Sequence, residues 1–275
     1  MRRIASAVLL LCLGTAPVLL STPAFAASPA AGGSICGTVW QDVNGDGIHE
    51  ANEPAMAGVG IGLDLDMNTS TDVNGKYCFT DLTAGTYTLQ ANDLAFFDGG
   101  LDWTRPGRGS HVDWTDGTSA PITVHVDADG SATHLNHFDV GYVKSTADLS
   151  AHRITFSQNG ERVRTNQFHV GDTFEISAAM KVSGNIPDSM GGELTLPDGL
   201  TILSTGGDMT TSVLGAHEVF GQAHGRLVPG SVERMTATVR VDSAFTSGDV
   251  TLDADLGIFD TDPSNDVLTT QISAS

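Results

Sequence analysis

The sequence predicts an all-β protein made of two tandem β-sandwich domains. Short runs of alternating apolar and polar residues recur along the chain, and clusters of Gly, Asn, Asp and Pro separate them. No stretch shows a sustained helical period. The chain has 275 residues, of which 40% are hydrophobic and 17% charged, so it is long enough for one large or two ordinary domains.

Residues 1–26 have the features of a secretory signal peptide. Two arginines precede an apolar run over residues 4–20, and a small-x-small triplet ends at Ala26. A membrane anchor is the alternative, but the run is short and contains Gly and Pro. We therefore expect a secreted, extracellular protein with a flexible leader at 27–33 and no membrane span.

The net charge limits the classes of partner. The chain has 13 Lys and Arg against 33 Asp and Glu, a formal charge of -20. Such a surface repels nucleic acid and anionic lipid, because phosphate binding requires clustered basic residues. Cations are the ligands that it attracts.

The cysteines indicate a disulfide. Cys12 leaves with the signal peptide, so Cys36 and Cys78 remain as a pair in an oxidising compartment. Both lie opposite the apolar face of their strands, where a bond would not disturb packing. Two separate buried thiols are the alternative.

The first domain is expected over residues 34–144. Its predicted strands cover 35–40, 59–65, 76–79, 86–90, 122–126 and 138–143. The stretch 92–117 is rich in Gly and Asp and holds Trp103 and Trp114, so we expect an ordered loop or irregular edge there.

The second domain is expected over residues 147–275, after a polar linker at 144–146. Its predicted strands include 173–182, 192–196, 235–241 and 250–256.

Residues 42–53 contain the motif that predicts a binding site. They match the calcium-loop pattern D-x-[DN]-x-[DN]-G-x5-E at every specified position. Calcium takes about six to eight oxygen ligands, so a short loop must turn side chains inward at alternate positions. A polar turn is the alternative, but a helical EF-hand is not, because Pro54 and Gly58 follow the loop. The predicted ligands are Asp42, Asn44, Asp46, the Ile48 carbonyl, Glu50 and Glu53, with Gly47 at the reversal.

The order of motifs around this loop is similar to a known family. Cys36-Gly-Thr-Val-Trp-Gln-Asp42 is followed by the loop, then by Thr71-Asp-Val-Asn-Gly-Lys-Tyr-Cys-Phe79 and Leu82-Thr-Ala-Gly-Thr-Tyr87. This succession resembles the B-type domain of serine–aspartate-repeat surface proteins (SdrD B-like). The resemblance implies a calcium-stiffened, Ig-like β-sandwich that serves as a spacer or stalk, with Asp72 as a further ligand candidate.

Two family features are not expected. The strand at 35–40 has no lysine for the Lys–Asn isopeptide bond of related collagen-adhesin B domains. A terminal LPxTG signal is missing, since the Leu-Pro-Asp-Gly at 196–199 is internal. The second half looks like the Ig-like repeat modules of bacterial surface proteins and is similar to CARDB domains.

Catalysis is not expected. His134-x-x-His137 would place its imidazoles on opposite faces of a strand, and no nucleophile or metalloprotease motif is present. A structural or adhesion-type spacer is the predicted function, and a protein- or glycan-binding module is the alternative, followed by an accessory domain of a secreted hydrolase. In that case Trp103 and Trp114 would be exposed stacking residues, whereas ordinary packing beneath the long loop is the simpler interpretation. The partner would be an extracellular protein or glycan, and the chain would be monomeric.

Overall fold

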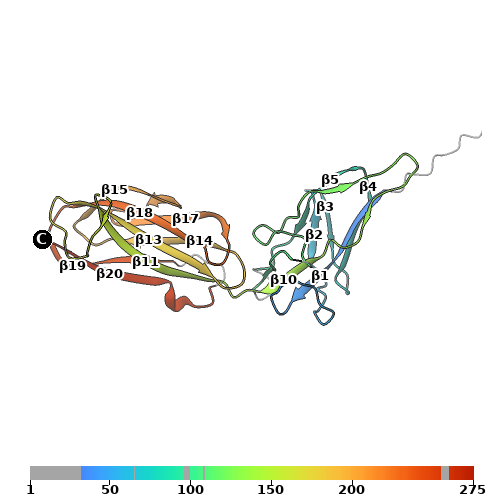
Figure 1. Cartoon of the computed structure of the whole chain (residues 1–275), viewed down its shortest axis with the longest axis horizontal. Coiled ribbons are helices and arrows are strands. Elements are labelled where there is room, and N and C mark those ends of the chain that lie inside the picture. Colours follow the sequence, from blue (N-terminus) through green and yellow to red (C-terminus); the bar gives the residue numbers. More distant parts are fainter. Residues whose placement is uncertain (1–31, 65, 96–99, 108, 255–259) are drawn as a thin grey trace, which may run out of the picture.

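The structure is a computed structural model that describes residues 32–64, 66–95, 100–107, 109–254 and 260–275. The predicted signal peptide and nearly all of the leader lie outside these residues. The predicted all-β class is confirmed: the described residues form two β-sandwich lobes arranged end to end (Figure 1). The helical element described is a single 3-10 turn, η1 (Pro263–Asn265). Among the described residues, no helix has the length and apolarity needed to cross a membrane.

The first domain contains the strands up to Lys144. They are β1 (Gly33–Asp42), β2 (Gly60–Leu63), β3 (Met67–Ser70), β4 (Lys76–Leu82), β5 (Gly85–Tyr87), β6 (Leu89–Ala91), β7 (Leu101–Trp103), β8 (Ile122–Val124), β9 (His134–Leu135) and β10 (Val140–Lys144). One sheet has the order β4-β1-β10-β7, with β9 beside β1. The strands β3-β2-β6 form a second sheet, and β5 pairs with β8. β1 begins at Gly33, so the last residue of the expected leader belongs to the domain.

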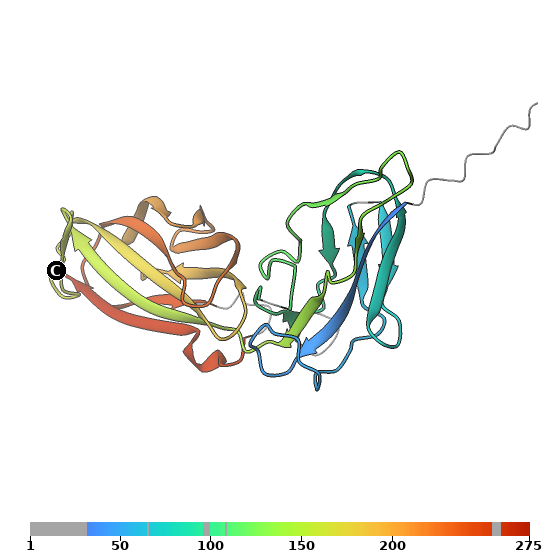
Figure 2. The ribbon, with the colours of Figure 1, turned by 45° about the vertical axis from the view of Figure 1, so that its right-hand side comes forward.

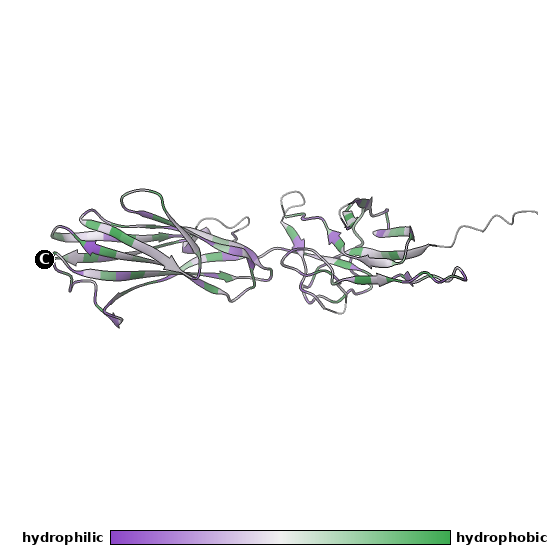
Figure 3. Ribbon diagram, turned by 90° about the horizontal axis from the view of Figure 1, so that it is seen from above, coloured by the Kyte–Doolittle hydropathy of each residue, from purple (hydrophilic) through white to green (hydrophobic). Residues whose placement is uncertain are grey.

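The core of the first domain lies between these sheets. Alternate residues of β1 and β4 enter it, including Ile35 at 0% and Tyr77 at 4% exposure. The alternation that predicted the strands is therefore the alternation of burial. Figure 3 shows the mixture of apolar and polar residues along the strands.

Two predicted elements of the first domain differ in the structure. The run at 86–90 splits into β5 and β6, which belong to different sheets. The split occurs at Thr88, whose N–H donates to the Asp64 carboxylate and whose carbonyl accepts from the Asp64 N–H. This pair of bonds turns the chain from one sheet to the other. The irregular stretch 92–117 contains β7, which is a full member of the main sheet.

The second domain begins at Asp148. Its strands are β11 (Asp148–Gln158), β12 (Glu161–Arg162), β13 (Thr173–Ser183), β14 (Asp188–Thr195), β15 (Leu200–Gly207), β16 (Thr210–Val213), β17 (Glu218–Leu227), β18 (Val232–Val241), β19 (Phe245–Asp253) and β20 (Val267–Ala274). Two sheets, β12-β11-β13-β18-β15 and β16-β17-β14-β19-β20, enclose one core. Phe168 and Phe174 stack on each other within it, with ring centroids 3.8 Å apart.

The two lobes are joined where β10 leads into β11. Figures 1 and 2 both show this short connection, with β1 beginning at the far end of the first lobe and the C-terminus at the far end of the second. β1 and β10 are parallel neighbours, with Val39 opposite Val140 and Asp42 opposite Val143. The candidate loop at 42–53 therefore starts at the end of the first domain that faces the second.

Candidate functional site

The loop at 42–53 is held at both ends by β1. Asp42 is the last residue of this strand, and after the loop the chain returns to pair Ala55 with Trp40. The N–H of Gln41 donates to the Pro54 carbonyl at 2.9 Å. Because the entry and exit are bonded to the same strand, the loop is a closed turn on the sheet rather than a free connection.

Asp42 organises the start of the loop. The residue is 1% exposed, and its carboxylate accepts the backbone N–H groups of Gly45 at 2.6 Å, Asp46 at 3.2 Å and Gly47 at 2.8 Å. The Thr104 hydroxyl donates to the same carboxylate at 2.5 Å. Four donors thus surround a buried charge, which is how a protein stabilises a carboxylate removed from water.

Glycine is required at position 47. Its φ is +77°, a left-handed conformation, and a Cβ there would lie 2.7 Å from the Arg105 carbonyl oxygen. The segment after β7 lies directly against the loop at this point. The Gly109 N–H donates to the Gly47 carbonyl at 3.2 Å, and the Arg105 guanidinium donates to the Gly45 carbonyl at 3.0 Å. The sequence analysis did not predict these partners, which lie about 60 residues away. The glycines of the 105–110 segment were the feature that could have indicated a close backbone contact.

Three predicted ligands converge in the middle of the loop. The Asn44 amide nitrogen lies 3.2 Å from an Asp46 carboxylate oxygen and 3.5 Å from a Glu50 carboxylate oxygen. The carboxylates of the loop lie close enough to affect one another's ionisation. The pKa of the Glu50 carboxyl is raised, first by loss of hydration and then by the three other carboxylates of the loop.

Glu53 closes the loop. Its carboxylate is buried and accepts the N–H of Val43 at 2.9 Å and that of Glu50 at 3.0 Å. It therefore joins the beginning of the loop to its end, as a residue at the twelfth position of a calcium loop must. The side chain of Ile48 points outward, 43% exposed, as expected for a residue that would contribute only its carbonyl.

The donor set fits calcium in kind. All side-chain donors are carboxylate or amide oxygens, which are the ligands that calcium prefers. In the part of the chain that the structure describes, no group of three or more His, Cys, Asp or Glu side chains is arranged as it would be around a metal ion. The oxygens of Asp42 and Glu53 accept backbone N–H groups instead. Calcium binding therefore stays a prediction.

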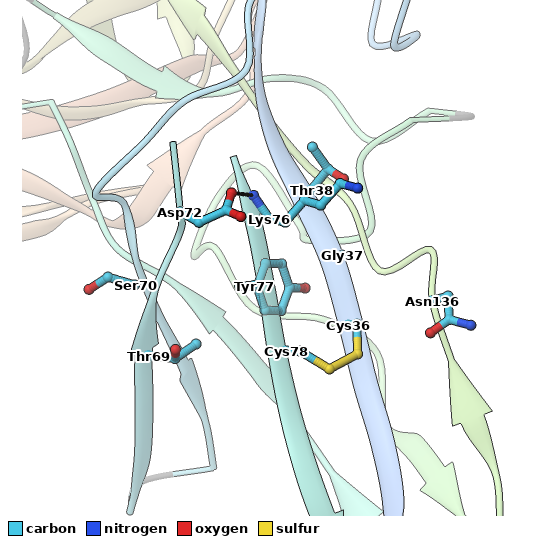
Figure 4. A pocket seen from close by; sticks show the side chains of 10 residues that line it. All are labelled: Cys36, Gly37, Thr38, Thr69, Ser70, Asp72, Lys76, Tyr77, Cys78 and Asn136. Carbon is cyan, nitrogen blue, oxygen red and sulfur yellow. Dashed lines mark hydrogen bonds between the residues drawn. A yellow bond between two sulfur atoms is a disulfide. The ribbon is translucent and has the colours of Figure 1, made fainter. Parts of the chain in front are cut away.

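Asp72 lies in a turn of its own between β3 and β4. Its carboxylate accepts the N–H groups of Asn74 at 2.8 Å and Lys76 at 2.9 Å, and these bonds lower its pKa. Figure 4 shows the bond to Lys76 beside a shallow groove that also contains Thr69, Ser70 and Asn136. The bonds described for this carboxylate stay within its turn and involve none of the loop residues at 42–53.

The predicted disulfide is present. Cys36 and Cys78 face each other directly across β1 and β4, and their sulfurs are bonded (Figure 4). Cys78 is exposed, while its neighbours Tyr77 and Phe79 are buried, as strand alternation predicts. A crosslink with a sequence separation of 42 stabilises the fold by about 4 kcal/mol in the chain-entropy model.

The two tryptophans do not form an exposed pair. Trp103 is 5% exposed and belongs to the core of the first domain, so it is not available for stacking on a ligand. Trp114 is half-buried and packs against the same core. The expectation of exposed stacking residues is therefore wrong for Trp103, because it belongs to β7, a member of the main sheet, and its side chain lies in the core.

The first domain matches a known family. Residues 33–142 match the family described as SdrD B-like domain. The chain is also 46% identical over 57 residues to the bone sialoprotein-binding protein of Staphylococcus aureus strain MRSA252 and to serine-aspartate repeat-containing protein E of strain MSSA476. Each alignment covers 19% of this chain and only 5% of the relative. The B-type assignment of the first domain is therefore supported.

Solved structures give weaker likenesses. The major pilin subunit BcpA of Bacillus cereus aligns with 88% of this chain and 69% of its own, at 14% identity and a TM-score of 0.27. The RrgB pilus protein of Streptococcus pneumoniae aligns with 82% of this chain and 49% of its own, at 13% identity and a TM-score of 0.36. These scores are too low to establish a shared fold, so the fold assignment depends on the sheets described above.

Proposed function

We propose that this protein is an extracellular, non-catalytic component of structural or adhesion type whose first domain binds calcium in the loop at 42–53. Residues 1–26 would direct its secretion. The first domain would act as a calcium-stiffened spacer, and the second as a CARDB-like interaction module. Its partner would be an extracellular protein or glycan.

The arrangement of the loop carries this proposal. Four carboxylates and one amide belong to a closed turn of twelve residues, and Glu50 already experiences the repulsion of the others. A divalent cation would remove that repulsion. Asp42, Asn44, Asp46, Glu50 and Glu53 would hold it, together with the Ile48 carbonyl.

The comparisons support the spacer and adhesion part. The SdrD B-like match covers the loop, β1, which carries it, and all but the last two residues of the sheet to which β1 belongs. One relative has a name that describes binding to bone sialoprotein. For this chain, binding to an extracellular protein is an extension of that likeness, and it can be tested by screening the secreted protein against immobilised matrix proteins and cell-wall glycans.

Calcium binding can be tested on the mature chain, residues 27–275. After chelator treatment, calorimetric titration with calcium chloride should show saturable binding with a Kd of about 10⁻⁴–10⁻³ M or tighter. Calcium at a hundredfold excess over the Kd should stabilise the folded chain by about 2.7 kcal/mol, raising the Tm by on the order of 10 °C.

Matched variants locate the site. Glu53→Gln should weaken calcium binding at least tenfold, because it removes the closing charge. Asp129→Asn is the control, since Asp129 is an exposed carboxylate in a turn of the same domain that accepts from Ser131. Asp72→Asn decides whether Asp72 contributes a ligand. Equal Tm values in chelator and in millimolar calcium would refute the calcium proposal.

A further inference from the structure

Arg226 of the second domain reaches across to the first. It lies near the end of β17, opposite Ser189 of β14. Its Nη1 donates to one carboxylate oxygen of Asp102 at 3.0 Å, and its Nη2 donates to the other oxygen and to the Pro187 carbonyl. The contact is therefore a bidentate ion pair between residues that are 124 apart in sequence.

This ion pair is largely removed from water. The side chain of Asp102 is 3% exposed and that of Arg226 is 16% exposed. The guanidinium also lies over the indole of Trp103, with 5.4 Å between its central carbon and the ring centroid. Surface ion pairs contribute little, but removing one partner of a buried pair leaves an uncompensated charge.

The position of Asp102 and Trp103 explains how the contact with Arg226 can fix the orientation of the two domains. Both residues belong to β7, where Asp102 lies opposite Val143 and Trp103 opposite Tyr142 of β10. β10 is the strand that leads into the second domain. Arg226 therefore binds β7, which is the neighbour of β10 in the sheet, close to the point where β10 leads into the second domain.

The connection between the domains is itself bonded. The Asn185 side chain accepts the Thr146 N–H at 2.8 Å and donates to the Lys144 carbonyl at 2.9 Å. On the other side, the Ser145 N–H donates to the Gly100 carbonyl at 2.7 Å. Residues 144–146, expected as a polar linker, are thus held by both domains.

A small apolar cluster and a close backbone approach complete the joint. Val143 of the first domain, Ala147 of the connection and Ile186 of the second are buried against one another. Gly184 has a φ of +96°, and a Cβ there would lie 2.0 Å from the Thr146 carbonyl oxygen. The two domains meet through packed and hydrogen-bonded surfaces rather than through a free hinge.

We propose that Arg226 is an interdomain latch, and that its grip on Asp102 and Trp103 holds the two domains as one rigid body. Domains in one chain ordinarily move relative to each other unless their interface is large and well packed. In this protein, the buried ion pair between Arg226 and Asp102 would restrict that motion without a large interface. None of the latch residues belongs to the loop at 42–53, but Thr104, directly after Trp103, donates to Asp42 of that loop, so the experiment keeps calcium constant.

The test uses the mature chain in saturating calcium and measures domain orientation by NMR residual dipolar couplings. In the wild-type protein, the couplings of both domains should fit one alignment tensor. Arg226→Met keeps the apolar stem but removes the charge, so the two domains should require different tensors. Trypsin cleavage after the exposed Lys144 should also accelerate more than tenfold.

Two further variants make the result decisive. Arg234→Met is the matched control, because Arg234 forms an exposed ion pair with Asp208 inside the second domain at 3.3 Å. It should leave one tensor and the wild-type cleavage rate. If Arg226→Met does not fold, Arg226→Lys keeps a charge beside Asp102 and should give an intermediate cleavage rate. A wild-type chain that needs two tensors would overturn the latch, as would an Arg226 variant that keeps one tensor and cleaves within twofold of wild type.

Discussion

At the scale of single residues, the loop at 42–53 depends on contacts with a distant segment. The Thr104 hydroxyl and the Arg105 backbone surround Asp42 and Gly47, although both lie far along the chain. The pattern of oxygen-bearing residues was readable in the sequence because it is local. The segment that covers the loop could not be identified from the sequence, since its contacts with the loop arise only when β7 joins the sheet beside β10.

Gly47→Ala and Gly58→Ala form a matched pair. Both glycines have nearly the same left-handed φ, +77° and +76°, but only Gly47 has a neighbour in the way of a Cβ. Each substitution should cost about 1–2 kcal/mol for the backbone conformation. Gly47→Ala should cost about 1–3 kcal/mol more, because the Arg105 carbonyl must move. Urea denaturation of the two variants measures the difference, and equal losses would show that the contact with Arg105 is unimportant.

At the scale of elements, two strand tyrosines fasten irregular segments to the first domain. Tyr77 of β4 donates to the Phe138 carbonyl, and Tyr142 of β10 donates to the Asn92 carbonyl. Burial raises the pKa of both hydroxyls well above the ordinary value. In the unfolded chain they ionise near pH 10.

Stability should therefore fall at alkaline pH. The contribution of these tyrosines is fully present below about pH 10 and is lost as the pH rises further, because only the unfolded state releases the protons. Urea denaturation between pH 8 and 11.5 should show this decline. The double variant Tyr77→Phe/Tyr142→Phe should be less stable at pH 8 but should have a flatter profile. An unchanged slope in that variant would assign the decline to other groups.

The success of strand prediction followed the regularity of the alternation. β1, β4 and β13 alternate cleanly and were expected within a few residues of their bounds. β17 carries small and polar residues at several positions and gives no such signal, while a bulge between Ala151 and Arg153 breaks the register of β11. β7 is three residues long in a Gly- and Asp-rich stretch, so only its pairing with β10 defines it.

At the scale of the whole molecule, each domain has a hydrophobic core of its own. The buried clusters of the two domains share no residue, and a separate small cluster lies at the joint. The division into two cores was predictable from the two series of strands. The ion pair between Arg226 and Asp102 was not, because nothing in either local sequence marks a partner 124 residues away.

A fragment covering residues 33–144 should fold alone. Its core is complete, so it should give a β-sheet circular dichroism spectrum and a cooperative thermal transition in calcium. Its Tm should lie below that of the same domain in the full chain, because Asp102 and Trp103 lose the cover of Arg226. A random-coil spectrum with calcium present would contradict the two-core organisation.

The parallel pairing of β1 and β10 has a mechanical consequence. The chain enters the first domain at one end through β1 and leaves it at the other through β10, and these two strands are hydrogen-bonded neighbours. A force that pulls the ends of the domain apart slides one strand along the other, so the ladder between them is sheared and all its bonds resist together. Hairpin neighbours pulled from their open end would instead unzip one bond at a time. The order of strands therefore suits the first domain to transmit tension along its long axis.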